Sequence, residues 1–99
     1  AEAKIQPNWT FLSNHAHVLI CLAKDPDCRL REIADLVGIT ERAVHRIIQE
    51  LEKSGYIKKS RDGRRNTYAI IPDRPMRHPI EAHHSINALL ILAQKKSRK

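Results

Sequence analysis

The 99-residue sequence is poor in cysteine, glycine and aromatic residues, with two cysteines, three glycines and four aromatics. Two cysteines are too few for a disulfide framework, so we expect a reducing compartment. Few glycines and aromatics argue against a large β-sandwich. The longest apolar runs, Val18–Ala23 and Ala88–Ala93, have six residues, whereas a membrane-spanning helix needs about 20. Since the first residues also lack the apolar core of a signal peptide, we predict a cytoplasmic protein that does not enter the membrane.

Catalytic motifs are absent as well. The sequence contains no Gly-rich phosphate loop, no nucleophile elbow and no Cys/His pair at a known catalytic spacing, and its acidic residues are scattered. We therefore predict that the chain is not an enzyme, and we assign it no cofactor and no metal site.

Positive charge is what the sequence has in excess, with 18 Lys and Arg against 11 Asp and Glu and a formal charge of +7. The excess is local, because segments 58–65 and 95–99 each carry +4 and the rest of the chain is close to neutral. Apolar and charged fractions of 41% and 29% are those of a single folded domain. The basic excess favours nucleic acid as a partner and, less strongly, an anionic membrane surface.

The first part of the chain has the capping residues and apolar spacing of two helices. Ser13 or Asn14 can cap a helix that runs to about Lys24 and stops at an Asp-Pro-Asp sequence, because proline cannot continue it. A shorter helix fits Arg31–Val37 and can end at Gly38, which adopts the left-handed conformation readily. The residues expected on their buried faces are Val18, Leu19 and Leu22 in the first helix, and Ile33, Ala34 and Val37 in the second.

A longer third helix is predicted next, capped by Thr40, reaching about Ser54 and ended by Gly55. Its apolar residues recur at spacings of three, four and seven, which is the pattern of one buried face. These residues are Val44, Ile47, Ile48 and Leu51.

The period then changes to that of β-structure, with strand-like segments 56–60 and 65–70 around a charged centre. The Asp-Gly sequence at 62–63 is a strong signal for a two-residue hairpin turn, because both turn positions favour a positive φ. With that turn, Ile57 pairs with Tyr68 across the strands, and the charged residues collect at the tip of the hairpin.

A last helix is predicted beyond a proline-rich connector, with Pro79 in its first turn and its end at about Gln94. Segment 88–93 is apolar on all sides, and a 99-residue monomer has little with which to cover it. We therefore expect a homodimer formed through this helix, with a contribution from Trp9 and Phe11. The predicted dimerisation residues in the helix are Ile86, Leu89, Leu90 and Ala93.

The order of helix, short helix, Gly-containing turn, longer helix and basic hairpin is the layout of a winged helix-turn-helix. Segment Leu30–Tyr68 resembles the DNA-binding domains of bacterial and archaeal regulators of the MarR and ArsR type. Ala34 stands where the two helices of the motif touch, Gly38 in the turn between them, and Gly55 before the wing. Apolar residues stand where the motif requires them, at Ile33, Val37, Ile39, Val44, Ile47 and Leu51.

The resemblance implies a mainly α fold with a small β-hairpin wing and a C-terminal dimerisation helix. The expected parts are an N-terminal arm at 1–13, a winged helix-turn-helix domain at 14–71, a connector and dimerisation helix at 72–94, and a basic tail at 95–99. The implied function is that of a nucleoid-associated transcriptional regulator that binds double-stranded DNA. Full-length MarR proteins have longer helical regions than the single helix after the wing here, so we expect no classical small-molecule pocket and identify no effector.

The resemblance places helix 40–54 in the major groove, where the face opposite its apolar residues can read bases. Arg42 and Arg46, one turn apart, can each grip a guanine edge, and Gln49 can read adenine. The predicted base-reading residues are Thr40, Glu41, Arg42, His45, Arg46 and Gln49. The alternative is an ordinary solvated helix face held by Glu41–His45 and Arg46–Glu50 pairs.

The basic hairpin, the wing at 58–67, is expected on the DNA backbone and in the minor groove. In the MarR pattern an Asp and an Arg lie close together at the wing tip, which points to Arg64 as the minor-groove residue. The predicted backbone and wing residues are Arg29, Arg31, Lys58, Lys59, Arg61, Arg64 and Arg65. The alternative is a charged loop that keeps an edge strand from aggregating.

Two further groups of residues have more than one interpretation. A cluster at His78, Glu81, His83 and His84 has residue types that bind zinc or nickel, but its spacing does not match metal-sensing ArsR proteins, and exposed or interface histidines are the alternative. Cys21 and Cys28 are either a redox pair or two inert thiols. At the level of the whole chain, the alternatives to a regulator are a winged-helix protein-interaction module and a nucleic-acid-binding accessory protein of low specificity.

Overall fold

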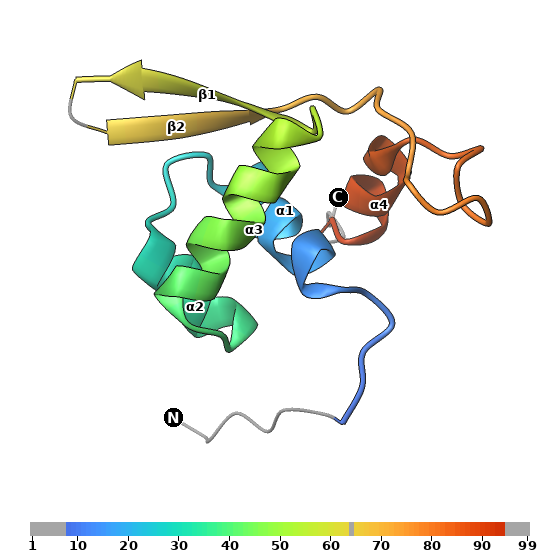
Figure 1. Cartoon of the computed structure of the whole chain (residues 1–99), viewed down its shortest axis with the longest axis horizontal. Helices are drawn as coiled ribbons and strands as arrows, with labels where there is room; N and C mark the ends of the chain where they lie inside the picture. The colour runs from blue at the N-terminus through green and yellow to red at the C-terminus, as the bar shows by residue number, and fades with distance from the viewer. Residues whose placement is uncertain (1–7, 64, 95–99) are drawn as a thin grey trace, which may run out of the picture.

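The computed structural model describes residues 8–63 and 65–94, apart from the side chains of Asp62 and Arg65. These residues form three helices, an antiparallel two-stranded hairpin and a fourth helix (Figure 1). The elements are α1 (Asn14–Lys24), α2 (Leu30–Val37), α3 (Glu41–Lys53), β1 (Ile57–Asp62), β2 (Arg65–Ile70) and α4 (Ile86–Leu92). The predicted fold class, a mainly helical protein with a β-hairpin wing and a C-terminal helix, is confirmed.

Local capping explains where the first three helices begin and end. The Ser13 hydroxyl accepts a hydrogen bond from the Ala16 N–H at 3.2 Å, which makes Ser13 and not Asn14 the cap of α1. Helix α2 begins one residue before the predicted start, and Gly38 ends it with a φ of 87°. A positive φ of this kind suits glycine, which has no Cβ to clash.

One hydrophobic core joins these elements. Helices α1, α2 and α3 pack on one another, and the hairpin packs against α1 and α3. The buried hydrophobic residues are Val18, Leu19, Leu22, Ile33, Ala34, Val44, Ile47, Ile48, Leu51, Tyr56, Ile57 and Ile86. All four residues predicted for the inner face of α3 are among them, and Val37 of α2 is only half-buried. Since full burial of one such side chain contributes about 1.5–3 kcal/mol, the core fixes which face of α3 points outward.

The hairpin register differs from the prediction by two residues. Ile57 pairs with Ile70 instead of Tyr68, and Asp62 pairs with Arg65. The reason is that Gly63, with a φ of 67°, supplies the positive φ at the first turn position, which leaves Asp62 in the strand. A shift of two residues keeps every side chain on its expected face of the sheet.

The last helix begins later than predicted. It starts at Ile86, not near Pro79, and ends at Leu92. The Met76 N–H donates to the His84 carbonyl at 3.0 Å, and the Ile86 N–H donates to the Arg74 carbonyl at 2.9 Å. These hydrogen bonds hold the residues before α4 in an extended bridge to the connector, so a helix cannot form earlier.

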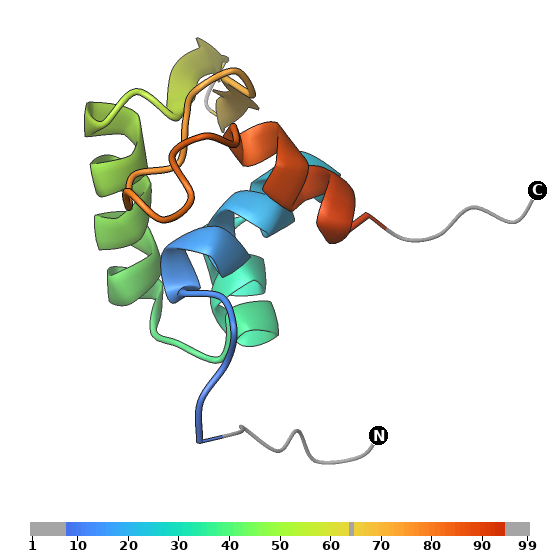
Figure 2. The same cartoon turned by 90° about the vertical axis from the view of Figure 1, so that its right-hand side faces the viewer.

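Helix α4 lies beside α1, and the connector loops between α4 and the end of α3 (Figure 2). None of the helices within residues 8–63 and 65–94 is both long and apolar enough to cross a membrane.

Candidate nucleic-acid interface

The outer face of α3 carries every residue predicted to read bases. The Thr40 hydroxyl accepts a hydrogen bond from the Ala43 N–H at 3.0 Å, which fixes the start of the helix at Glu41. With the opposite face buried, six polar side chains are exposed along one side of the helix. They are Thr40, Glu41, Arg42, His45, Arg46 and Gln49.

Neither of the ion pairs expected for an ordinary solvated helix face is formed. Glu50 is instead paired with His15 of α1. Arg42 and Arg46 are exposed, and neither takes part in an ion pair within this part of the chain. Their guanidinium groups are therefore available to an external partner with acceptor atoms, such as a base edge or a phosphate.

The His15–Glu50 pair links α1 to α3. The His15 Nε2 atom lies 2.6 Å from Glu50 Oε1, and both side chains are about half exposed. The hydrogen bond from His15 is the main reason that the pKa of Glu50 lies below its ordinary value, and the charges of Arg46 and Arg77 lower it further. Sequence reasoning missed this pair, because 35 residues separate its members and no periodicity connects positions on different helices.

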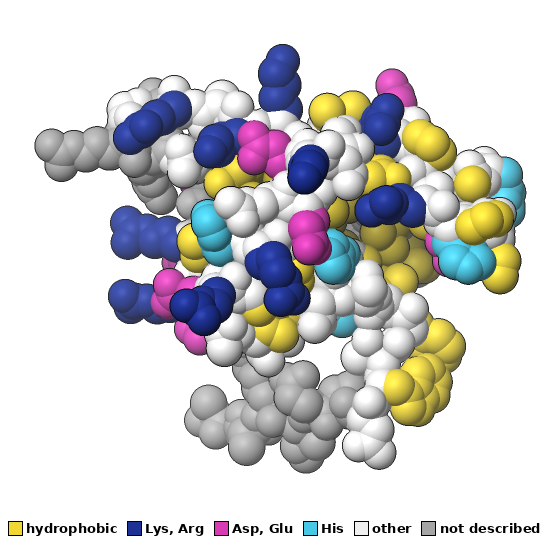
Figure 3. Space-filling model, viewed as in Figure 1, with side chains coloured by type: hydrophobic (Ala, Val, Ile, Leu, Met, Phe, Trp, Pro, Cys, Tyr) yellow, Lys and Arg dark blue, Asp and Glu magenta, His cyan; other side chains and the backbone are white. Residues whose placement is uncertain are grey.

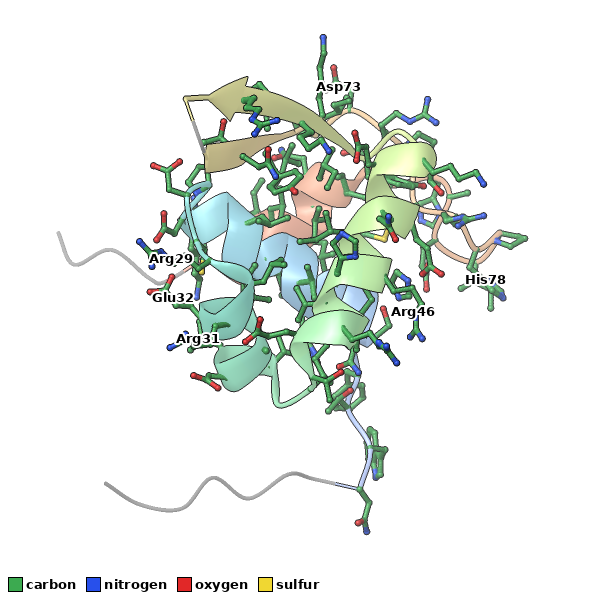
Figure 4. The ribbon with its side chains drawn as sticks, turned by 60° about the vertical axis from the view of Figure 1, so that its left-hand side comes forward. Arg29, Arg31, Glu32, Arg46, Asp73 and His78 are labelled. Atoms are coloured by element: carbon green, nitrogen blue, oxygen red, sulfur yellow. The ribbon has the colours of Figure 1, made fainter. Side chains whose placement is uncertain are left out.

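The start of α2 presents the two arginines expected on the DNA backbone. Arg29 and Arg31 are exposed, and they extend beside Glu32, while Arg46 projects from α3 (Figure 4). The Glu32 carboxylate accepts a hydrogen bond from the Arg29 N–H at 2.9 Å, which caps the helix. This cap uses the Arg29 backbone and not its guanidinium group.

The wing carries three described cations, on both faces of the sheet. Lys58, Lys59 and Arg61 are all exposed. Because side chains alternate along a strand, Lys59 and Arg61 share one face and Lys58 occupies the other. The predicted minor-groove residue Arg64, the side chain of Arg65 and the basic tail at 95–99 lie outside the described residues.

The junction between α3 and the wing is held by the connector. Arg74 Nη2 donates to the Ser54 carbonyl at 3.1 Å, and the Tyr56 hydroxyl donates to the Pro75 carbonyl at 2.6 Å. The Arg74 guanidinium also lies over the Tyr56 ring, 5.8 Å from its centroid. These residues fix the angle at which the wing leaves α3. The sequence offered no signal for them beyond the position of Gly55.

The structure bears on the two interpretations left open for Cys21 and Cys28 and for the histidine cluster at 78–84. Burial raises the pKa of Cys21, and burial together with a hydrogen bond to Glu32 raises the pKa of Cys28 to about 11. A raised pKa keeps a thiol protonated and unreactive. Within residues 8–63 and 65–94, no group of three His, Cys, Asp or Glu residues is placed to hold a metal ion.

Charge and hydrophobicity occupy different parts of the surface. Lys and Arg side chains spread over the wing, α2 and α3, whereas hydrophobic and His side chains gather on the side of the connector, around a hollow (Figure 3). The side of the molecule with the exposed polar face of α3 is therefore suited to a polyanion.

Two helices joined by a Gly turn, with a polar outer face on the second and a basic hairpin after it, define a class of protein: the winged helix-turn-helix proteins. In agreement, residues 14–58 match the family model described as winged helix-turn-helix DNA-binding. Residues 14–58 are therefore a winged helix-turn-helix domain, and the chain has a winged helix-turn-helix fold.

Solved structures of ZitR from Lactococcus lactis, described as a zinc-responsive MarR family member, are similar to this chain. Wild-type ZitR in complex with DNA is 24% identical, with a TM-score of 0.53. A second ZitR structure is 25% identical, with a TM-score of 0.50. Each match covers 70% of this chain and 49% of ZitR, so the chain spans about half the length of the solved structures that it matches. No curated protein is similar in sequence.

Proposed function

We propose that the chain is a transcriptional regulator that binds specific sequences of double-stranded DNA. The observation that carries this proposal is the outer face of α3, where six polar side chains are exposed because the opposite face is buried in the core. The solved structure of ZitR with DNA supports the proposal, since a chain of the same fold binds DNA there. A cytoplasmic, nucleoid-associated location goes with this function.

In this proposal α3 enters the major groove with its N-terminal residues toward the bases. Arg42 and Arg46 then contact guanine edges, and Gln49 contacts adenine. The wing and the start of α2 contact phosphates, which sets the register of the protein on the duplex. The DNA-binding part is residues 14–71, and residues 72–94 serve assembly.

We further propose that two copies act together through α4. Ile86 is buried in the core of its own chain, so it is not a contact residue for a second copy. The apolar side chains of α4 and its C-cap that remain accessible are Ala88, Leu89, Leu90, Ile91, Leu92 and Ala93. Two reading helices related by a twofold axis would meet half-sites about 34–36 Å apart, so the preferred site is expected to be palindromic.

Selection of bound duplexes from a random pool, followed by affinity measurement, tests the proposal. Replacement of Arg46 by Ala should relax base preference at one position, at a cost of about 1–3 kcal/mol on the preferred site. Lys59→Ala should instead weaken binding on all sequences and reduce the salt dependence by about one phosphate contact. Arg77→Ala removes the same charge from the connector and should leave the base preference unchanged.

The outcomes separate the alternative functions. Binding that is salt-sensitive but equal on all duplexes would indicate an accessory protein of low specificity. The absence of salt-sensitive duplex binding at low ionic strength would contradict DNA binding by the whole chain and favour a protein-interaction module.

A further inference from the structure

The carboxylate of Glu50 lies where α1, α3 and the connector meet. His15 of α1 approaches it most closely, with Nε2 2.6 Å from Glu50 Oε1. The hydrogen bond from His15 lowers the pKa of Glu50, and the charges of Arg46 on α3 and, less strongly, Arg77 in the connector lower it further. One carboxylate is therefore shared by positively charged or hydrogen-bonding side chains from three segments of the chain.

Arg46 is the natural partner of Glu50 on an isolated helix. The two residues are four apart on α3, and oppositely charged side chains at this spacing face each other and attract. In the folded chain Glu50 nevertheless forms its hydrogen bond with His15, which comes from a different helix. The Arg46 side chain is exposed and projects from α3 (Figure 4). The contact with α1 thus takes the place of a pair within α3.

This exchange of partners matters for DNA recognition. Arg46 can grip a guanine edge only with two of its N–H groups directed at the base. A carboxylate binds the same N–H groups, so a pair with Glu50 would have to break before the arginine could reach a base. Any contact that keeps Glu50 away from Arg46 therefore favours base recognition.

We propose that His15 is a positioning residue for base recognition, which holds the Glu50 carboxylate on α1 and so leaves the Arg46 guanidinium free to contact DNA. The proposal rests on the function proposed above and gives α1 a part in the choice of sequence. His15 acts through Glu50 and Arg46, without a contact of its own to the duplex. Because Arg46 acts on Glu50 more strongly than Arg77 does, Arg46 is the partner that Glu50 takes once His15 is removed.

The quantity to measure is the ratio of affinities for two duplexes. One is the preferred duplex, and the other has a change at the base pair whose preference is lost in Arg46→Ala. A change in overall charge alters the affinity for both duplexes alike and cancels in the ratio. A smaller folded fraction also lowers both affinities equally, so the ratio reports recognition and not stability.

His15→Ala should lower this ratio about two- to fivefold, which is the strength of one exposed ion pair expressed as a ratio of affinities. His15→Gln, whose side-chain amide N–H can replace the Nε2 donor, should keep most of the ratio. The matched control is His17→Ala, because His17 bonds to Asn14 within α1. It should leave the ratio unchanged.

Two double variants show whether His15 acts through Glu50 and Arg46. Glu50→Gln in the His15→Ala background removes the competing charge and should restore the ratio. In the Arg46→Ala background, His15→Ala should cause no further loss of affinity for the preferred duplex. Together the variants form a double-mutant cycle for each partner.

The other outcomes separate this proposal from the function on which it rests. A ratio in His15→Ala equal to that of the unchanged chain contradicts the positioning role. A fall that Glu50→Gln does not reverse, or a further loss in the Arg46→Ala background, contradicts it too, because His15 then acts by another route. Both results leave sequence-specific binding intact. If the unchanged chain binds all duplexes equally, the proposed function fails, and the role of His15 fails with it.

Discussion

Single residues at the ends of α3 set what the helix can present. Thr40 is both the N-cap, through its hydrogen bond to the Ala43 N–H, and the first residue of the exposed face. Glu50, in the last turns, is tied to α1 by His15. The two ends of α3 are therefore held by different interactions: a local N-cap at one end and a contact with α1 at the other.

The cap makes a prediction about stability. Thr40→Ala should lower the free energy of unfolding by about 1 kcal/mol, because one backbone N–H of the first turn loses its partner. Thr40→Ser keeps the hydroxyl and should cost much less. Urea unfolding followed by circular dichroism measures both values. Equal losses in the two variants would show that the methyl group, and not the hydrogen bond, matters at this position.

The His15–Glu50 pair predicts a dependence of stability on pH. Because the folded-state pKa of Glu50 is lower than its ordinary value of 4.5, its carboxylate stabilises the fold above that value, and the contribution is lost as the pH falls through the folded-state pKa. Glu50→Gln and His15→Ala should therefore each weaken the fall in stability on the acid side. His17→Ala, on the same helix, should not. Urea unfolding at a series of pH values below about 6 measures the slope, and an unchanged slope in both variants would contradict the assignment.

Cys28 predicts slow thiol chemistry. A pKa of about 11 instead of 9.0 leaves about 100-fold less thiolate at pH 8. Alkylation of Cys28 by iodoacetamide should therefore be much slower in the folded chain than in urea, as measured by mass spectrometry of the peptides. A rate equal to that of the unfolded chain would restore the redox interpretation.

At the scale of elements, the two glycines that follow α3 and β1 have different surroundings. Gly55 has a φ of 86°, and a Cβ there would lie 3.2 Å from Arg74 Nη2. Gly63 has a φ of 67°, and a Cβ there would meet nothing within 4 Å. Both positions resist a side chain because of the backbone, but only Gly55 also makes room for the contact that holds the connector.

Gly55→Ala should consequently destabilise the fold more than Gly63→Ala. The conformational cost is about 1–2 kcal/mol at either position, and the new methyl group in Gly55→Ala also crowds the Arg74 guanidinium that donates to the Ser54 carbonyl. In the Arg74→Ala background the difference between the two glycine variants should shrink. A double-mutant cycle in urea measures this coupling, and equal costs in both backgrounds would show that the contact is unimportant.

The sequence predicted those elements whose signals are local. The cap of α3 at Thr40, the left-handed Gly38 and the apolar spacing within α3 each depend on residues within about one turn, and the structure agrees with them. For α1 the sequence offered Ser13 or Asn14 as the cap, and the structure has Ser13. The start of α4 was predicted wrongly, because it is decided by hydrogen bonds between the connector and residues 84–86, which no helical pattern encodes. The hairpin register was also predicted wrongly. A positive φ at Gly63 is compatible with Gly63 in the second position of the turn, as predicted, and in the first, as observed.

The exposed residues of the candidate site could be predicted because burial of one face of α3 determines the other. The groove of about 1110 Å³ beside the connector could not be predicted. Its walls come from four separate segments: the start of α1, the end of α3, the connector and α4. Such a surface exists only after the chain has folded, and its members share no spacing in the sequence.

At the scale of the whole molecule, one helix belongs to two surfaces. The N-terminal part of α3 carries the exposed polar face, and its last residues, including Glu50, Leu51 and Lys53, line a groove bounded by the start of α1, the connector and α4. A helix of 13 residues is a stiff rod about 20 Å long. The two ends of this rod keep a fixed position relative to each other, so whatever packs against the end of α3 at Glu50 and Lys53 also fixes where the Arg42 and Arg46 side chains stand.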